Sequence, residues 1–320
     1  MESHDVMSRS PVGATQEVAH GRAAAPARFS HAALLYRERD EYLSEISDFA
    51  SSAGKAPVHA VLSWNSTLPA RLTLPVMSSV ELGRNPARLI PAGLSFADEY
   101  PGEQVYCLWE PAWPGRSAAE LTEVARHEAL CNLAFADRPV TLLCLYDASR
   151  LSEETIARVE STHPVLISAG RRRASFSYSG PGVMPPGCDD PLPEPDPGAE
   201  SLGFTDQLTA VRVFAARHAT AAGLGPARTR DLTLAVSEIA ANALGHASGG
   251  VIRAWRGPGE LICQIEDGGH IEDPLAGLRR RPPEQPGGHG LWLVNLLCDL
   301  VERRTGPAGT VTRLHMCTTP

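Results

Sequence analysis

Apolar positions along the chain follow two spacings, one typical of helices and one typical of buried strands. Helical spacing occurs over residues 36–54 and again over 118–136. Short apolar runs of strand length lie at 58–64 and at 140–147. Because helices and strands alternate here, the first half of the chain is predicted to be an α/β domain around a largely parallel sheet.

A second group of elements begins near residue 201. Its apolar periodicity predicts helices at 205–222, 228–247 and 288–302, and strands at 250–256, 260–266 and 309–317. An Arg- and Pro-rich loop is expected at 273–286, ahead of the last helix. No internal repeat is visible along the chain, so this group is predicted to be a second α/β unit.

Changes in composition mark the boundaries between these units. Residues 1–28 are polar and Ala-rich without an apolar period, which predicts a disordered tail. Residues 171–200 include a stretch dense in Pro, Gly and Asp, which predicts an extended linker. Two domains are therefore expected, at 29–170 and at 201–320, and each is long enough to have a core of its own.

Composition also limits the class of protein. Apolar residues make up 43% of the 320 residues and charged residues 21%, as in globular proteins. The formal net charge of -8 argues against direct binding of nucleic acid, because phosphates require a basic surface. No apolar run approaches the ~18 residues of a membrane span, and the N-terminus lacks the order of a signal peptide. A soluble, cytoplasmic protein without membrane contact is expected.

Seven cysteines are scattered along the chain, and no two of them form a CxxC pair. Most of them have apolar neighbours in the sequence. An odd number of cysteines without regular spacing favours reduced, buried thiols over a disulfide framework or a zinc site.

The stretch SEIAANALGH places two polar side chains in a helix that is otherwise apolar. Glu238 and Asn242 are four residues apart and therefore lie on one face of that helix. A carboxylate and an amide that face inward are costly unless a polar group meets them. One explanation is a bound polar ligand, and the alternative is a capped or solvated helix edge.

Two glycine-containing motifs follow this helix in the sequence. IEDGGH, at 265–270, is an apolar strand that ends in Asp267, and PGGHGLWLVNLL, at 286–297, leads from glycines directly into a helix. Glycine turns and helix N-termini bring backbone N–H groups close to phosphates. An amide oxygen suits Mg²⁺, and a carboxylate at the end of a strand can accept a hydrogen bond from the amine of a base. Each motif alone is weak, but their order and spacing together indicate a nucleotide site.

These three motifs resemble the N box and the two glycine boxes of the ATP-binding module shared by gyrase, Hsp90, histidine kinases and MutL. The closest form is the compact one of the anti-sigma-factor serine kinases. The resemblance covers about 110 residues and implies a Bergerat-type α/β sandwich. It also implies ATP and Mg²⁺ as cofactors, Glu238 as the catalytic base and Asn242 as the Mg²⁺ ligand. The remaining cofactor-binding residues that it implies are Asp267 and Thr310 at the adenine, Gly288, His289, Gly290 and Leu291 along the phosphates, and Gly269 in the first glycine box.

The first glycine box departs from the family pattern Asp-x-Gly-x-Gly. Asp267 is followed by Gly268, Gly269, His270 and Ile271, so the second family glycine is missing or shifted. Because a glycine is missing there, we expect a stiffer hinge in the segment that covers the phosphates in this family. A separate helical dimerisation segment with a phosphoacceptor histidine is not visible, which argues against a two-component histidine kinase.

The first domain offers fewer chemical signals. Lys55 lies in SSAGKAP, which lacks the upstream glycine of a P-loop and fits a turn at a helix end. Glu110, Arg116, His127 and Glu128 could line a small-molecule pocket, but a set of structural ion pairs is the favoured interpretation. A metal site at His127 is disfavoured because no second His or Cys lies near it in the sequence.

Residues 31–170 also resemble the MEDS family of sensory domains. The matching stretches are HAALLYRERDEYL, GRNPARLIPA, EPAWPGRS and RHEALCNLAFAD. The resemblance implies a RecA/KaiC-like α/β fold without a working P-loop, and it implies no particular ligand.

Together the two resemblances imply an anti-sigma regulatory factor controlled by its N-terminal sensory domain. The expected partners are a sigma factor and an anti-anti-sigma factor of the STAS type, whose serine the protein phosphorylates as a serine/threonine kinase. The alternative is a binding module that requires ATP but transfers no phosphate, with a histidine-kinase-type sensor as a third reading. Both a monomer and a homodimer remain open.

Overall fold

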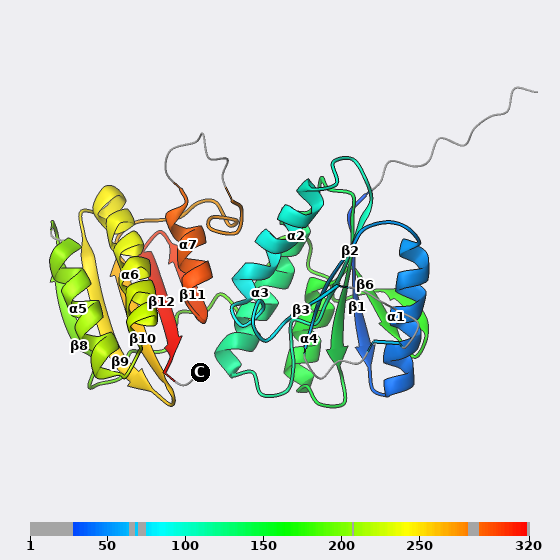
Figure 1. Cartoon of the computed structure of the whole chain (residues 1–320), viewed down its shortest axis with the longest axis horizontal. Helices are drawn as coiled ribbons and strands as arrows, with labels where there is room; N and C mark the ends of the chain where they lie inside the picture. The colour runs from blue at the N-terminus through cyan, green and yellow to red at the C-terminus, as the bar shows by residue number, and fades with distance from the viewer. Residues whose placement is uncertain (1–27, 64–67, 70–74, 207, 281–287, 319–320) are drawn as a thin grey trace, which may run out of the picture.

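The computed structural model describes residues 28–63, 68–69, 75–206, 208–280 and 288–318, and they form two α/β domains (Figure 1). The expected N-terminal tail lies outside these residues except for Arg28. None of the helices in the described part of the chain combines the length and apolarity needed to cross a membrane.

The first domain is built on a seven-stranded sheet with the order β3-β2-β4-β5-β1-β6-β7. All neighbouring strands are parallel except β6 and β7. The strands are β1 (Ser30–Tyr36), β2 (Val58–Leu62), β3 (Val76–Ser78), β4 (Val105–Trp109), β5 (Val140–Asp147), β6 (Val165–Ser168) and β7 (Arg171–Ala174). The predicted parallel α/β architecture is confirmed.

Helices cover both faces of this sheet (Figure 1). One core contains the apolar side of α1 (Arg39–Ala53). A larger core on the other face contains side chains of α2 (Leu89–Asp98), α3 (Ala118–Ala134) and α4 (Glu153–Thr162). The single-turn helix η1 (Pro86–Arg88) leads into α2.

The second domain is an antiparallel sheet with helices packed against it. The strand order is β11-β12-β10-β9-β8. Its strands are β8 (Glu200–Phe204), β9 (Gly250–Gly257), β10 (Glu260–Asp267), β11 (Leu300–Gly306) and β12 (Gly309–Cys317). Helices α5 (Leu208–Ala221), α6 (Pro226–Ala247) and α7 (Gly290–Leu297) share one apolar core with the sheet, so the domain is a two-layer α/β sandwich.

Two predicted boundaries are wrong. The helix expected at 288–302 ends at Leu297, and β11 follows it, because Leu300, Val301 and Glu302 pair with β12. The linker expected from residue 171 begins later, because β7 adds an antiparallel strand to the first sheet.

Residues 175–199 connect the domains without a helix or strand, and they contact both of them. In the first domain, Arg126 donates a hydrogen bond to the carbonyl of Cys188 at 2.8 Å. In the second, Arg304 and Arg313 donate to the carbonyls of Asp190 and Pro193 at 3.0 and 2.5 Å. This connection contains several turns, and these hydrogen bonds hold its middle part to both domains.

A buried ionic cluster joins three strands of the second domain. His315 on β12 lies between Glu260 on β10 and Glu302 on β11, with ring nitrogens 3.1 and 2.9 Å from the two carboxylates. Burial alone would lower the pKa of His315, but the hydrogen bonds and charges of the two glutamates raise it from 6.5 to about 9. The protonated ring is therefore more stable in the folded state than in the unfolded state, and protonation of His315 stabilises the fold.

We expect His315→Gln to remove a pH-dependent part of the stability. A histidine with a raised folded pKa stabilises fully below its unfolded pKa of 6.5, and this contribution is lost as the pH rises through about 9. Below that window the variant should lose on the order of 3 kcal/mol in the free energy of unfolding, and the difference should shrink above it. Urea denaturation at several pH values measures this. His59→Gln is the control, since burial lowers the pKa of His59 to about 4 and its effect should be flat over this range.

Candidate functional site

Helix α6 carries the first motif at the edge of its buried face. Gly225 caps its N-terminus and Pro226 starts its first turn, where the missing N–H has no intrahelical partner to lose. One side of the helix is fully buried in the domain core. Glu238 and Asn242 lie beside that side, one turn apart and half-buried, so both can reach a ligand and solvent.

The carboxylate of Glu238 lies against the start of α7. A Cβ atom placed on Gly290 would be 2.5 Å from Glu238 Oε2, so only glycine fits there without displacing the carboxylate. Gly288, with φ of 76°, and His289 precede this residue and form the turn into the helix. The first N–H groups of a helix have no partner within it and favour an anionic ligand.

The second motif lies at the end of β10. Asp267 Oδ1 accepts a hydrogen bond from the backbone N–H of Gly269 at 2.8 Å, which orients the carboxylate. Burial raises the pKa of Asp267, while the Gly269 N–H and the charge of His246 act in the opposite direction. Because Gly269 occupies Oδ1, the second oxygen is the acceptor that this geometry offers to the amine of a base.

Thr310 fixes the first glycine box in position. It is paired with Asp267 in the β10–β12 register, and its hydroxyl donates to the carbonyl of Gly269 at 2.8 Å. Gly269 also packs against the C-terminal end of α6, since a Cβ on it would lie 3.6 Å from that of Ala247. The structure therefore brings all three motifs together around α6.

Leu291 has a different setting from the other expected phosphate-binding residues. Its side chain packs against the core of the second domain, and a Cβ on Gly277 would lie 2.8 Å from its own Cβ. In the first turn of α7, Leu291 therefore offers only its backbone to a ligand.

The four polar residues singled out in the first domain do not form one pocket. Glu110 accepts a hydrogen bond from the backbone N–H of Ser63 at 2.7 Å. Arg116 donates to the carbonyls of Gly83 and Arg84 and stacks over the Trp113 ring. These contacts agree with the favoured interpretation of structural interactions. His127 and Glu128 point in different directions from the same helix, His127 toward the second domain and Glu128 toward His31.

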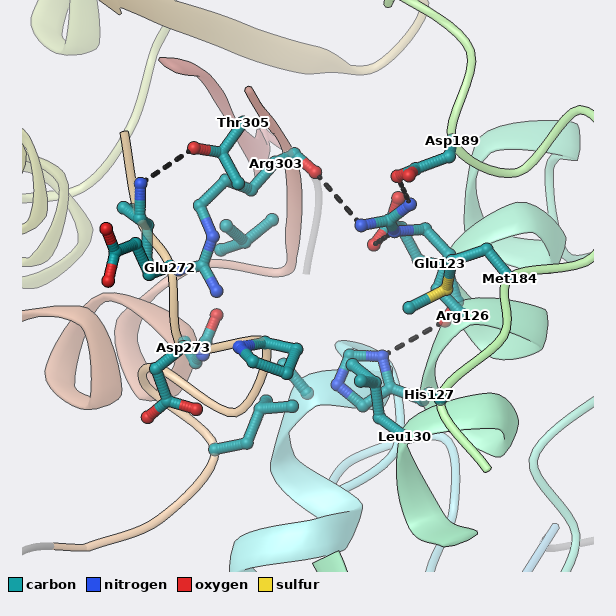
Figure 2. A pocket seen from close by; sticks show the side chains of 17 residues that line it. Glu123, Arg126, His127, Leu130, Met184, Asp189, Glu272, Asp273, Arg303 and Thr305 are labelled. Atoms are coloured by element: carbon teal, nitrogen blue, oxygen red, sulfur yellow. Dashed lines mark hydrogen bonds and ion pairs between the residues drawn. The ribbon is translucent and has the colours of Figure 1, made fainter. Parts of the chain in front are cut away.

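A cavity of about 240 Å³ lies between the two domains, and nothing in the sequence predicted it. Figure 2 shows side chains of α3 on one side of it and those of β11 and residues 271–274 on the other. His127 lines this cavity, with Nδ1 3.0 Å from the carbonyl of Glu123. Burial lowers the pKa of His127 to about 4, so the ring is neutral, and among the described residues its Nε2 has no hydrogen-bond partner. Periodicity gave no signal for this cavity, because its lining comes from two domains.

Comparison with known proteins identifies both domains. Residues 30–164 match the family described as the methanogen/methylotroph, DcmR sensory domain (MEDS). Residues 204–316 match the family described as the histidine kinase-like ATPase domain. No curated protein matches the chain.

One similar solved structure contains the RsbU and RsbW domains of a Mycobacterium tuberculosis protein. The sequences are 19% identical, and the match covers 64% of this chain and 49% of that one, with a TM-score of 0.26. The chain thus spans about half the length of that structure, and no argument rests on this likeness. The family matches show that the chain joins a MEDS domain to a histidine kinase-like ATPase domain.

Proposed function

We propose that the chain is an ATP-dependent anti-sigma regulatory factor whose second domain binds Mg²⁺ and ATP. The observation that carries this proposal is the convergence of three motifs on α6. Glu238 meets Gly290, Gly269 meets the end of the same helix, and Thr310 holds Gly269 in place. A site with these contacts has an acceptor for the base, N–H groups for phosphates and oxygen donors for a hard cation.

Each residue has a role that its position supports. Asp267 accepts the adenine amine beside Thr310, and the first turn of α7 binds phosphates. Asn242 offers an amide oxygen of the hard type that Mg²⁺ prefers. Glu238, one turn away on the same face, accepts the proton of the attacking hydroxyl.

The proposed reaction transfers a phosphoryl group to a STAS-type partner. The serine hydroxyl of the partner forms a bond to the γ-phosphorus, the bond to the β-phosphate oxygen breaks, and ADP leaves. The serine proton passes to Glu238. Phosphoryl transfer depends mainly on positioning and electrostatics, so this small constellation is sufficient. The sigma factor is the second partner, held while ATP is bound.

A non-catalytic binding module is the second candidate function. The backbone N–H of Ile271 donates to the Thr305 hydroxyl on β11 at 2.9 Å, which ties down the residue where the family pattern has glycine. A segment held at this point closes less readily over phosphates. ATP would then act as a structural ligand that sets the affinity for the sigma factor.

Contacts of the segment between the glycine boxes support control by the first domain. Leu275 and Leu278 are buried in the larger core of the first domain, although they belong to the second domain in sequence. The guanidinium of Arg279 lies 3.5 Å from the carbonyls of Leu133 and Ala134 at the end of α3. A change in the first domain would therefore move the segment that leads to the phosphate site.

The first domain also contacts the C-terminal end of α7. Asn85 and Arg88 both donate to the carbonyl of Asn295, at 2.9 and 3.0 Å, and Arg88 donates to that of Cys298 at 2.6 Å. The last carbonyls of a helix have no partner within it, and cationic donors are favourable there. Both elements that would surround the phosphates are thus held by the MEDS domain.

Asp267→Asn should weaken ATP binding by roughly 1.5–3 kcal/mol, or about 10- to 150-fold in Kd, because a charge-assisted hydrogen bond is lost. Titration calorimetry with ATP and Mg²⁺ measures the change. Glu266→Gln is the matched control, since that carboxylate lies on the same strand but pairs with Arg253. Equal affinities for wild type and Asp267→Asn would rule out the adenine contact.

Glu238→Gln should leave ATP affinity nearly unchanged and reduce phosphoryl transfer about 10²- to 10⁴-fold, as expected for loss of a positioned base. Asn242→Ala should lose Mg²⁺-dependent binding and transfer together. Asp231→Asn, earlier on the same helix, is the control and should change neither. The assay follows γ-phosphate transfer to a STAS partner beside nucleotide affinity. A wild type that captures its sigma factor with ATP but transfers nothing would establish the binding-module function instead.

Leu278→Ala should loosen the segment between the glycine boxes, because a buried leucine contributes about 2–5 kcal/mol at such a site. Amide hydrogen exchange over 271–279 should accelerate by roughly 30-fold or more, and the ATP Kd should change with it. Leu234→Ala, at an exposed leucine on α6, is the control. Unchanged exchange in Leu278→Ala would show that the first domain does not hold this segment.

A further inference from the structure

Four potential metal ligands meet inside the first domain, away from the nucleotide site. They are His31 on β1, Glu128 on α3, Cys144 on β5 and His163 at the end of α4. All four side chains are buried, and their ligand atoms lie within 4.8 Å of one another. Such a group needs an explanation, because buried charge and unpaired polar atoms are costly.

Glu128 Oε2 is the central atom of this cluster. It lies 3.0 Å from His31 Nε2, 3.1 Å from His163 Nε2 and 3.4 Å from Cys144 Sγ. The thiol sulfur is also 3.6 Å from His31 Nε2. Two ligands of a tetrahedral zinc ion lie about 3.3–3.6 Å apart when the bonds are about 2.0–2.3 Å long. The cluster therefore already has nearly the spacing of a coordination shell.

Hydrogen bonds define which nitrogen of His31 carries the proton. Asn132 donates its amide hydrogens to the carbonyls of Glu128 and Thr162, at 3.1 and 2.8 Å. Its oxygen therefore faces His31 Nδ1, 3.2 Å away, and accepts the proton there. The lone pair of the neutral ring is then on Nε2, directed toward Glu128.

His163 has the same arrangement. Its Nδ1 lies 2.8 Å from the carbonyl of Val159, which can only accept, so Nδ1 donates. Its Nε2 is buried 3.1 Å from Glu128 Oε2, and this contact lacks the geometry of a hydrogen bond. Metal-binding histidines typically donate their other ring N–H to a carbonyl or amide oxygen in this way. In their neutral forms, both rings therefore direct a nitrogen lone pair toward the same carboxylate oxygen.

Protonation of the two histidines is an unfavourable way to neutralise the buried carboxylate of this cluster. The two imidazole rings are 4.1 Å apart between centroids, so a charge on both would be strongly repulsive. A divalent cation with one carboxylate, one thiolate and two neutral imidazoles has no net charge, which is the favourable state for a fully buried site.

We propose that His31, Glu128, Cys144 and His163 bind one divalent transition metal ion, with Zn²⁺ as the best fit. Imidazole and thiolate ligands exclude Mg²⁺ and Ca²⁺, and four protein ligands form the closed shell of a structural zinc site. On binding, the Cys144 thiol releases its proton to solvent and the sulfur bonds to the metal. Asn132 and the Val159 carbonyl orient the two rings.

This site lies on the helix that contacts the ATPase domain. Glu128 follows Glu123 and Arg126 on α3, whose side chains bond to the second domain. Glu123 pairs with Arg304 at 2.7 Å, and Arg126 donates to the carbonyl of Arg303 at 3.4 Å. Metal occupancy would therefore fix the position of α3 and of the contacts it makes. The metal proposal stands on the first domain alone and does not depend on the proposed kinase activity.

The test uses the full-length protein purified without chelators. Elemental analysis should find one Zn²⁺ per chain, or the protein should take up one equivalent of added Zn²⁺ with a rise in Tm. Co²⁺ in the same site should give a thiolate-to-cobalt charge-transfer absorption together with tetrahedral ligand-field bands. A wild type that binds neither metal stoichiometrically, or whose Co²⁺ form lacks the thiolate band, would overturn the proposal whatever the variants do.

Variants assign the ligands. Cys144→Ser should abolish the charge-transfer band, and His163→Gln should weaken Zn²⁺ binding more than about 100-fold, since even outer-shell partners contribute about 10–100-fold. Asn132→Ala should weaken binding within that smaller range. Cys107→Ser and His59→Gln are the controls, because both residues are buried in the same sheet but do not belong to the cluster. Metal binding that is equal in Cys144→Ser and Cys107→Ser would show that the metal is held elsewhere.

Discussion

The arrangement of the protein depends on the burial of Leu275 and Leu278 in the core of the first domain. These residues belong to the segment between the two glycine boxes. A polar side chain in place of either leucine would be buried without a partner, which is costly. Because burying a leucine stabilises by about 1.5–3 kcal/mol, the two side chains couple the folding of both domains. The first domain therefore provides the surface on which the segment between the glycine boxes of the second domain rests.

Helix α3 is the element through which both domains are joined. Most of this helix is shielded from solvent, and even its polar residues Glu123, His127, Glu128 and Asn132 are buried. Glu123 and His127 face the second domain, while Glu128 and Asn132 face the interior of the first. Because buried polar groups on both sides of the helix need their partners, contacts with both domains fix the position of α3. A shift of the helix on one side therefore changes its contacts on the other.

Much of the fold could be predicted from the sequence, and the failures have physical causes. Strands β5 and β12 have the predicted bounds, since their apolar runs end at polar or glycine residues. The end of α7 was missed because apolar residues continue at helical spacing through Cys298 and Val301. Pairing of Val301 and Glu302 with β12 overrides that periodicity, and no local signal reports it.

The residues of the proposed nucleotide site could be singled out from the sequence because each motif is contiguous. The buried cluster could not, because its four residues come from four elements. Only the parallel pairing of β1 with β5, which aligns His31 with Leu142 and Ala33 with Cys144, places the first and third of them together. The sequence disfavours a metal site at His127, but it gives no sign that the next residue, Glu128, faces two histidines.

The two sites lie in separate domains, and thermodynamics restricts how they can communicate. A ligand in the first domain can change ATP affinity only if it binds one arrangement of the interface more tightly than another. The contacts of Arg88 with α7 and of Leu278 with the first core are the interdomain contacts that a second arrangement would have to change. Coupling between binding sites is reciprocal, so ATP must change the affinity of the first domain for its own ligand by the same factor. If the second domain binds ATP as proposed and the first domain holds its segment 271–279, the affinity of the first domain for its own ligand therefore depends on the nucleotide.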